Sequence, residues 1–146
     1  MSHQAPLLIV EDSDEDFETV VEALALSNLS NPVLRATSGD ACLRLLRGTG
    51  QATALRPALV LLDLNMPGMD GRDALSELRE DDSIEPCHVV VLSTSANPRD
   101  VEQCYRSGAS AFHVKPMRYP DHLRLLEELL RYWIARVVPV RLGGRP

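Results

Sequence analysis

The sequence predicts an α/β fold, in which a doubly wound five-stranded parallel sheet carries five helices on its two faces. Two patterns favour this fold class. Short, continuous apolar runs are typical of strands that are buried on both sides of a parallel sheet, and each run is followed by a segment with helical periodicity. Five such pairs in succession imply right-handed crossovers, which place helices on both faces of a single sheet.

Each element follows from this alternation, taken in chain order. The apolar runs predict five strands at Leu7–Val10, Val33–Ala36, Ala58–Leu62, Val89–Ser93 and Ala111–Val114. The periodic segments after them predict helices over about Asp14–Leu26, Asp40–Arg47, Arg72–Glu80, Arg99–Ser107 and Pro120–Val138.

The residues between these segments support the boundaries. Gly39 opens the second helix, the turn "NMPGMDG" precedes the third, and Asn97 with Pro98 leads into the fourth. Gly108 is expected to terminate the fourth helix, and Pro120 suits the first turn of the last one. The turn and capping residues therefore lie at the boundaries that the hydrophobic periodicity predicts.

Composition indicates one domain and excludes some partners. The chain has 146 residues, 45% of them hydrophobic, and we expect one domain over residues 1–138 with a short tail, 139–146, and no output domain. A formal charge of -6 argues against nucleic acid and anionic membrane surfaces, which need basic patches. Without a membrane-length apolar segment or a signal peptide at "MSHQAP", the expected location is the cytoplasm.

The cysteines and histidines give no sign of a metal or disulfide site. Cys42, Cys87 and Cys104 are odd in number and lack metal-ligand spacing, so we interpret them as reduced packing residues. The four histidines show no paired spacing either.

Polar residues gather where the predicted strands end. Glu11 and Asp12 follow the first strand, Asp63 the third, Thr94 the fourth and Lys115 the fifth. Ligands of doubly wound sheets bind beyond these carboxyl ends, so the five side chains should converge. Three carboxylates in one place repel each other unless a cation joins them, and a hard divalent ion such as Mg²⁺ suits their oxygen ligands.

The same constellation suits phosphoryl transfer. An aspartate can act as the nucleophile once the incoming phosphoryl oxygens are neutralised by a cation and a lysine. Lys115 is the only lysine in the chain, and its compact charge is not interchangeable with the planar guanidinium used elsewhere. The hydroxyl of Thr94 could bond a phosphate oxygen.

Each of these features alone has a simpler explanation. Acidic residues from Glu11 to Asp16 could form the first turn of a helix, and Asp63 could cap a turn. Thr94 and Lys115 could be ordinary strand-end residues. Their joint placement at the ends of four of the five predicted strands favours a site.

With these residues in place, the chain resembles the receiver domain of two-component response regulators from Leu7 to about Val137. The matching motifs are "LLIVEDS", "ALVLLDLNMPGMDG", "VVVLSTSA" and "GASAFHVKP". The resemblance implies the flavodoxin-like strand order 2-1-3-4-5, which a chemotaxis member of this family also has. It also implies a phospho-acceptor rather than an enzyme, with at most slow self-dephosphorylation.

Residue roles follow from the same resemblance. Asp63 would accept a phosphoryl group from the phosphohistidine of a sensor histidine kinase. Asp12, Asp63 and the backbone carbonyl of Asn65 would ligate Mg²⁺, and Glu11, where the family more often has aspartate, would contact the metal through water. Thr94 would be the switch hydroxyl and Lys115 the phosphate-binding lysine. The Lys115–Pro116 bond is expected to be cis, as is typical of the family.

Phosphorylation is expected to switch a surface on the fourth helix, the fifth strand and the last helix. Thr94 would move toward the phosphate and open space for the aromatic Phe112, where the family commonly has tyrosine. The alternative is that Phe112 always stays in the core. A downstream protein, which the sequence does not identify, would bind the switched surface.

The last helix is more apolar than one packed face requires. A first stripe, expected to pack on the sheet, consists of Leu123, Leu126, Leu130, Ile134 and Val137. A second stripe, expected to form an interface, consists of Leu125, Leu129, Tyr132 and Trp133. We expect a two-fold homodimer through this helix; burial of the whole face by the chain's own tail is the alternative.

The motif "LSTSAN" and the long, Trp-bearing last helix are similar to those of single-domain regulators paired with phytochrome-type (bacteriophytochrome) histidine kinases. Two other functions remain open from the sequence. One is an aspartyl-phosphate hydrolase of the haloacid-dehalogenase type, with Asp12 and Asp14 as its first-strand acidic pair. The other is a degenerate receiver that serves only as a scaffold.

Overall fold

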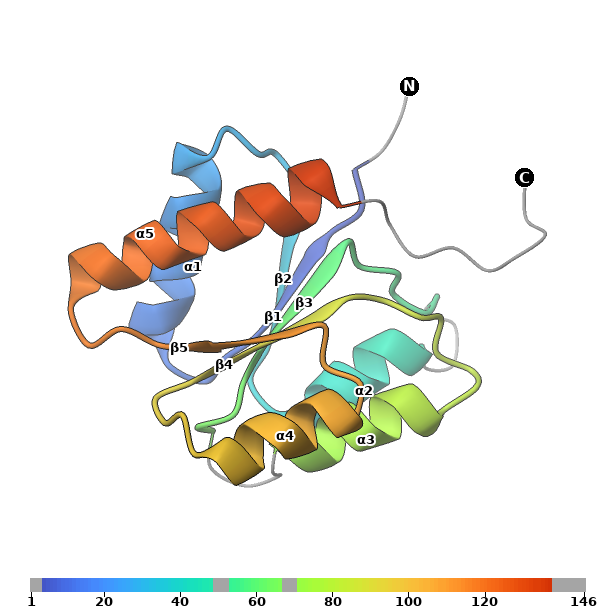
Figure 1. The fold of residues 1–146 in the computed structure, drawn as a ribbon. Coiled ribbons are helices and arrows are strands. Elements are labelled where there is room, and N and C mark those ends of the chain that lie inside the picture. The colour runs from blue at the N-terminus through green and yellow to red at the C-terminus, as the bar shows by residue number, and fades with distance from the viewer. Residues whose placement is uncertain (1–3, 49–52, 67–70, 138–146) are drawn as a thin grey trace.

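The computed structural model describes residues 4–48, 53–66 and 71–137 (Figure 1). Five parallel strands form one sheet in the order β2-β1-β3-β4-β5, which confirms the expected doubly wound fold. The strands are β1 (Leu7–Val10), β2 (Val33–Ala36), β3 (Leu59–Asp63), β4 (Val89–Ser93) and β5 (Ala111–Val114). The helices are α1 (Asp14–Leu26), α2 (Gly39–Arg47), α3 (Gly71–Glu80), α4 (Pro98–Arg106) and α5 (Tyr119–Leu130), which continues into a π-helical segment, Arg131–Arg136.

Helices cover both faces of the sheet (Figure 1). Helices α1 and α5 lie side by side on one face, and α2, α3 and α4 lie on the other. Because strand side chains alternate between the faces, Leu7, Ile9 and Leu61 pack toward α1 and α5, while Leu8, Val10 and Leu62 pack toward the other three helices. The central strands β1, β3 and β4 are buried along their whole length, as their continuous apolar runs predict.

Capping side chains and a glycine mark helix ends at the positions that the sequence predicts. Ser13 accepts a hydrogen bond from the backbone N–H of Asp16 and so caps α1, and Asn97 caps α4 ahead of Pro98. Gly108 follows α4 with φ of 103°, and a Cβ there would lie 2.6 Å from Cγ of Arg79. Both facts explain a glycine at this position.

The element boundaries differ little from those predicted. Strand β3 begins and ends one residue later than expected, so that Asp63 is its last residue. The last helical segment ends at Arg136 instead of Val138. The sequence has Pro139, and helices usually end at or before the residue that precedes a proline.

Two expectations about side chains and backbone are wrong. Leu129 is not exposed: it is buried among the residues under α1 and α5, because the sheet and α1 together cover a wider face of α5 than one narrow stripe. The Lys115–Pro116 bond is trans, since the structure has no cis peptide in the residues it describes. The trans form is the intrinsically favoured one.

Some expectations concern residues outside this description. The turn residues 67–70 and the tail 139–146 belong to them. Among the described helices, none has the length and apolar character needed to cross a membrane.

Candidate functional site

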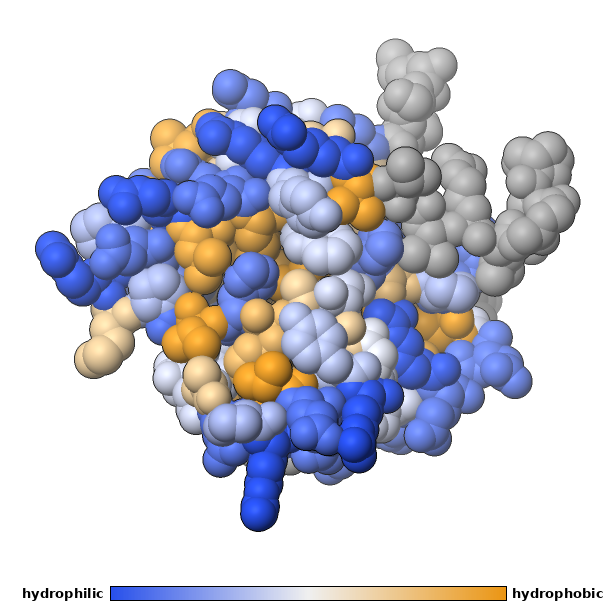
Figure 2. All heavy atoms as spheres, viewed as in Figure 1, coloured by the Kyte–Doolittle hydropathy of each residue, from blue (hydrophilic) through white to orange (hydrophobic). Residues whose placement is uncertain are grey.

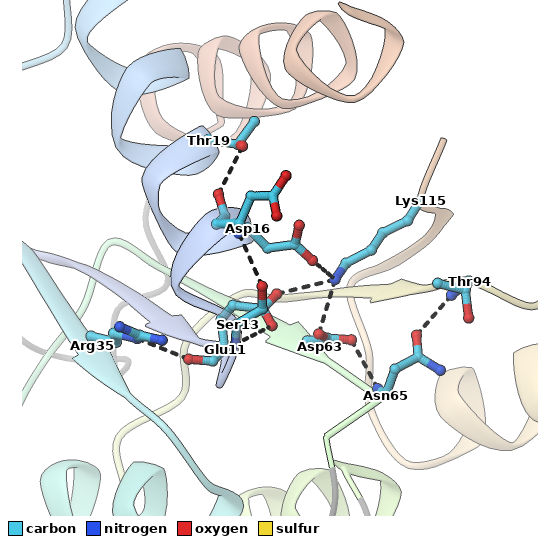
Figure 3. Close-up of polar contacts among 10 residues, drawn as sticks. Glu11, Ser13, Asp16, Thr19, Arg35, Asp63, Asn65, Thr94 and Lys115 are labelled. Atoms are coloured by element: carbon cyan, nitrogen blue, oxygen red, sulfur yellow. Dashed lines mark hydrogen bonds and ion pairs between the residues drawn. The ribbon is translucent and has the colours of Figure 1, made fainter. Parts of the chain in front are cut away.

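Side chains from β1, β3 and β5 meet at the carboxyl edge of the sheet (Figure 3). Lys115 follows β5, and its Nζ donates to Oε1 of Glu11 at 3.1 Å and to Oδ2 of Asp63 at 2.9 Å. All three residues are buried. The structure therefore brings together three of the five residues for which the sequence predicts convergence, whereas Asp12 and Thr94 are exposed.

A third carboxylate, from α1, completes the group around the lysine. Lys115 Nζ donates to Oδ2 of Asp16 at 2.7 Å, the shortest of its three contacts. Asp16 stands in the first turn of α1, where Ser13 Oγ accepts from its backbone N–H at 3.2 Å. In the sequence, Asp16 belongs to an acidic run from Glu11 that also suits the first turn of a helix, so no local signal singles it out.

Glu11 is held in place by its neighbours. Its Oε2 accepts from the backbone N–H of Ser13 at 3.2 Å, and its backbone carbonyl accepts from Nε of Arg35 at 2.9 Å. Burial, and after it the hydrogen bond and negative charge of Asp63, raise the pKa of Glu11 to about 7, against the opposing charge of Lys115. A second cation would relieve this repulsion between the two carboxylates.

The lysine is stabilised in its charged form. Burial by itself would lower the pKa of Lys115, but hydrogen bonds to Asp16 and Asp63 and the charges of Asp63 and Glu11 outweigh burial and raise this pKa. Lys115 is thus a fixed positive charge beside Asp63. That is the property needed to attract an anionic phosphoryl group.

The oxygens of this acidic group suit a divalent metal. In the part of the chain that the structure describes, Glu11, Asp16 and Asp63 each offer a ligand atom, and these atoms lie within 4.8 Å of one another. Hard cations favour such oxygen ligands. Asp12, the metal ligand that the resemblance implies, is exposed and is not one of these three residues.

Asn65 links the end of β3 to the end of β4. Its backbone N–H donates to Oδ1 of Asp63 at 2.8 Å, and its side-chain Oδ1 accepts from the backbone N–H of Thr94 at 2.8 Å (Figure 3). Thr94 itself is exposed at the rim. Asn65 therefore connects Thr94 to Asp63, and a shift of the Thr94 backbone would change the contacts of Asn65 with Asp63.

A cavity opens beside the charged group. Its volume is about 310 Å³, and Asp16, Thr94, Lys115 and His122 contribute to its walls. Because Lys115 is one of the lining residues, the cavity provides space for a further group beside the lysine.

The edge strand β5 carries the second predicted switch residue. Phe112 is half-buried and packs against the core on the side of α2, α3 and α4. Its backbone N–H donates to the hydroxyl of Tyr105 at 3.1 Å, which ties β5 to α4. Tyr105 could not be identified from the sequence, because nothing local distinguishes it from other surface tyrosines.

The surface between α5 and β5 is partly apolar. Figure 2 shows hydrophobic side chains gathered between α5 and α4, over β5. A groove of about 300 Å³ lies here, and its walls include Leu125, Leu129, Tyr132 and Trp133. Tyr132 is 54% exposed, whereas Trp133 is half-buried with its ring centroid 5.1 Å from that of His88. The predicted second stripe thus lines a groove, with Leu129 as its buried floor.

Known proteins that resemble this chain include several response regulators. The family profile of the response regulator receiver domain matches residues 7–127. Response regulator Rcp1 of Synechocystis sp. is 32% identical over 132 residues, which cover 90% of each chain.

Solved structures agree in both fold and sequence. The Mn²⁺-bound form of Rcp1 has a TM-score of 0.86 at 30% identity and covers 94% of this chain and 99% of its own. The phosphorylated cyanobacterial phytochrome response regulator RcpA has a TM-score of 0.87 at 31% identity, with coverages of 96% and 100%. The bacteriophytochrome response regulator AtBRR has a TM-score of 0.69 at 30% identity, with coverages of 98% and 100%.

Proposed function

Because this chain belongs to the response regulator receiver family and so to two-component phosphorelay signalling, we propose that Asp63 is its phospho-acceptor. The observation that carries the proposal is the contact of 2.9 Å between Asp63 and the buried Lys115 at the carboxyl edge of the sheet. The donor is the phosphohistidine of a sensor histidine kinase.

The chemistry is a displacement at phosphorus. One carboxylate oxygen of Asp63 attacks the phosphoryl group, the bond from phosphorus to the histidine nitrogen breaks, and the imidazole leaves. Lys115 supplies a fixed positive charge to the phosphoryl oxygens, and Thr94 a hydroxyl. The chain acts as an acceptor and not as an enzyme with a separate substrate; slow self-dephosphorylation returns it to its starting state.

The proposed metal is Mg²⁺, which when bound neutralises phosphoryl oxygens. Glu11, Asp12, Asp63 and the backbone carbonyl of Asn65 would hold it, Glu11 through water. Two observations support a divalent ion: the acidic group at this edge and the raised pKa of Glu11, which a nearby cation would lower. The relative Rcp1 has a Mn²⁺-bound form.

The output is a change in the surface formed by α4, β5 and α5. Thr94 and Phe112 are the proposed switch residues. Hydrogen bonds support these two roles. Asn65 links Thr94 to Asp63, and Tyr105 links Phe112 to α4. A downstream protein would bind the altered surface.

The proposed kinase is of the phytochrome type, and the proposed assembly is a homodimer. RcpA and AtBRR are described as phytochrome and bacteriophytochrome response regulators, and each aligns along nearly the whole chain. The groove along α5 supports a self-interface formed by Leu125, Tyr132 and Trp133, with Leu129 beneath them. Residues 1–138 would be the receiver.

Buried, free thiols at Cys42 and Cys87 fit the reducing conditions of the cytoplasm, where we place the reaction.

The hydrolase alternative is not favoured. Asp14, the second member of its acidic pair, has an exposed side chain and pairs with Arg35 at 2.7 Å, away from Lys115. The ion pair between Asp63 and Lys115 also argues against the second alternative, a degenerate receiver that serves only as a scaffold.

The proposed acceptor is tested by labelling with acetyl phosphate and Mg²⁺, followed by peptide mass analysis. We expect one phosphoryl group on Asp63 in the wild-type chain and none in Asp63→Asn. Asp73→Asn, a change of the same kind in α3, is the control and should be labelled normally. Label on Asp12 would support the hydrolase, and no label in the wild-type chain would support the scaffold.

A further inference from the structure

The imidazole of His122 is buried and incompletely hydrogen-bonded. The residue lies in the first turn of α5 and is 7% exposed, and its Nε2 has no hydrogen-bond partner among the residues that the structure describes. Burying a polar atom without a partner costs free energy, and an apolar side chain at this place would avoid that cost. Packing alone therefore does not explain a histidine here.

His122 borders the cavity beside the proposed phosphorylation site. It lines this cavity of about 310 Å³ together with Lys115 and Thr94, the two residues proposed to bind phosphoryl oxygens. Lys115 in turn contacts Asp63 at 2.9 Å. A cavity of this size with polar groups in its walls can hold water, which can carry a proton between the solvent and the imidazole.

Charged groups of three other elements face His122. Glu15 and Asp16 of α1 and Lys115 after β5 line the same cavity, and Asp63 of β3 is near enough for its charge to act on the imidazole. Burial lowers the pKa of His122 below the ordinary value of 6.5, and the charges of Asp16 and Asp63 oppose it only in part. The charge of Lys115 acts with burial. The imidazole is therefore neutral at pH 7.5 before phosphorylation.

Phosphorylation shifts this balance toward the protonated imidazole. A phosphoryl group carries a charge of about -1.5 to -2 at neutral pH, whereas the carboxylate that it modifies carries a single negative charge. Because the charge of Asp63 already favours the protonated form of His122, more negative charge at Asp63 favours that form further. Mg²⁺ that is bound both before and after phosphorylation does not offset this increase. Tyr119, the titratable residue of α5 that also lines the cavity, stays neutral because its hydrogen bond to Glu22 raises its pKa.

We propose that His122 takes up a proton when Asp63 is phosphorylated, so that a falling pH favours the phosphorylated state. This inference rests on the proposed function of Asp63. The proton comes from the solvent and adds to a ring nitrogen, and no other bond is formed or broken. By linkage, protonation of His122 strengthens phosphoryl binding by the same factor by which phosphorylation strengthens proton binding.

NMR tests the proton uptake directly in the wild-type chain. Histidine labelled with ¹³C at Cε1 reports the pKa of each assigned imidazole with and without beryllofluoride, a stable mimic of the phosphoryl group, in saturating Mg²⁺. We expect the pKa of His122 to rise when beryllofluoride binds. His88 is the matched control, because it precedes β4 and so lies at the opposite edge of the sheet, and its pKa should not change.

The pH dependence of beryllofluoride affinity tests the reciprocal effect. We expect the ratio of the Kd at pH 6.0 to the Kd at pH 8.0 to be roughly threefold to fivefold lower in the wild-type chain than in His122→Gln, at the low end for coupled sites because His122 is only partly protonated at pH 6.0. His88→Gln should match the wild-type chain. Glu11, whose pKa is about 7, titrates in all three chains, so only the difference between the chains reports on His122.

Each contrary result has its own meaning. A pKa of His122 that stays constant or falls on beryllofluoride binding, an equal rise at His88, or equal Kd ratios in the wild-type chain and His122→Gln would overturn the proton uptake while leaving Asp63 as the acceptor. Absence of any beryllofluoride response in the wild-type chain, or an undiminished response in Asp63→Asn, would overturn the proposed function and this inference with it. The NMR measurement uses the wild-type chain and so does not depend on how well a variant folds.

Discussion

At the scale of single residues, Lys115 organises the site. It is the only lysine of the chain, it is buried, and it contacts carboxylates from three different elements. Its partners are 52, 99 and 104 residues away in sequence. The strand ends that bear Glu11 and Asp63 could be predicted from periodicity, whereas Asp16 could not, because its direction depends on how α1 leaves the sheet.

His122 predicts how stability depends on pH. It lies in the first turn of α5 and is 7% exposed, and burial lowers its pKa below the ordinary value of 6.5. The nearby charge of Lys115 acts in the same direction, while Asp16 and Asp63 oppose it. A group whose pKa is lowered on folding is protonated more easily in the unfolded chain, so the contribution of His122 to stability is full above pH 6.5 and falls as the pH drops below that value.

We therefore expect the change in melting temperature from pH 7.5 to pH 5.5 to be less favourable for the wild-type chain than for His122→Gln. Glu11, whose pKa is raised to about 7, stabilises both chains as the pH falls through this range, whereas His113, whose pKa burial lowers, destabilises both, so only the difference between the chains reports on His122. Thermal unfolding followed by circular dichroism at the two pH values measures this difference. Equal changes in the two chains would exclude His122 as a source.

At the scale of secondary-structure elements, the contact between α4 and β5 deserves a test because β5 is an edge strand. The backbone N–H of Phe112 donates to the hydroxyl of Tyr105 rather than to another strand. Edge strands carry such unpaired groups, and a side chain from the neighbouring helix occupies this one.

Tyr105→Phe removes only the hydroxyl. We expect the amide of Phe112 to exchange with solvent roughly threefold to tenfold faster, which corresponds to about 0.5–1.5 kcal/mol for one hydrogen bond. Hydrogen exchange followed by NMR measures it. Tyr119→Phe is the matched control, since Tyr119 bonds Glu22 and not β5. Equal exchange rates at Phe112 in all chains would show that water replaces the hydroxyl without loss.

Hydrophobic periodicity does not predict how much of helix α5 is buried. Leu126 and Leu130 are buried as the first stripe predicts, but Leu129 of the second stripe is buried as well. A helix packed against both a sheet and a neighbouring helix, here α1, hides more than one stripe. The sequence shows how apolar a helix is, but not how wide a face its neighbours cover.

At the scale of the whole molecule, the groove beside α5 and β5 carries the proposed homodimer. Tyr132, one of the residues that line it, is 54% exposed. An arginine in its place would have to be taken out of water in a symmetric interface, at a cost of several kcal/mol that Glu128 of the same groove offsets only in part.

Sedimentation at several concentrations tests the dimer. We expect the wild-type chain to self-associate and Tyr132→Arg to remain monomeric, with the same melting temperature within about two degrees, since an exposed substitution has little effect on the fold. Tyr119→Arg, at a similarly exposed tyrosine outside the groove, should behave like the wild-type chain. A monomeric wild-type chain at high concentration would refute the dimer.

The sequence alone predicts the alternation of strands and helices, because local hydrophobic periodicity depends only on neighbouring residues. It also predicts that Glu11, Asp63, Thr94 and Lys115 lie along one edge, since parallel strands bring their carboxyl ends together. Through resemblance it indicated the strand order and the family.

The three-dimensional arrangement of the elements decides which acidic side chain of the segment after β1 reaches the lysine. Asp12 is exposed, and Asp16 makes the contact at 2.7 Å. It also decided that Leu129 is buried and that Tyr105 bonds β5. Each of these outcomes depends on how elements far apart in the chain are placed relative to one another. Two aspartates, or two leucines, in the same local sequence pattern can therefore have different contacts.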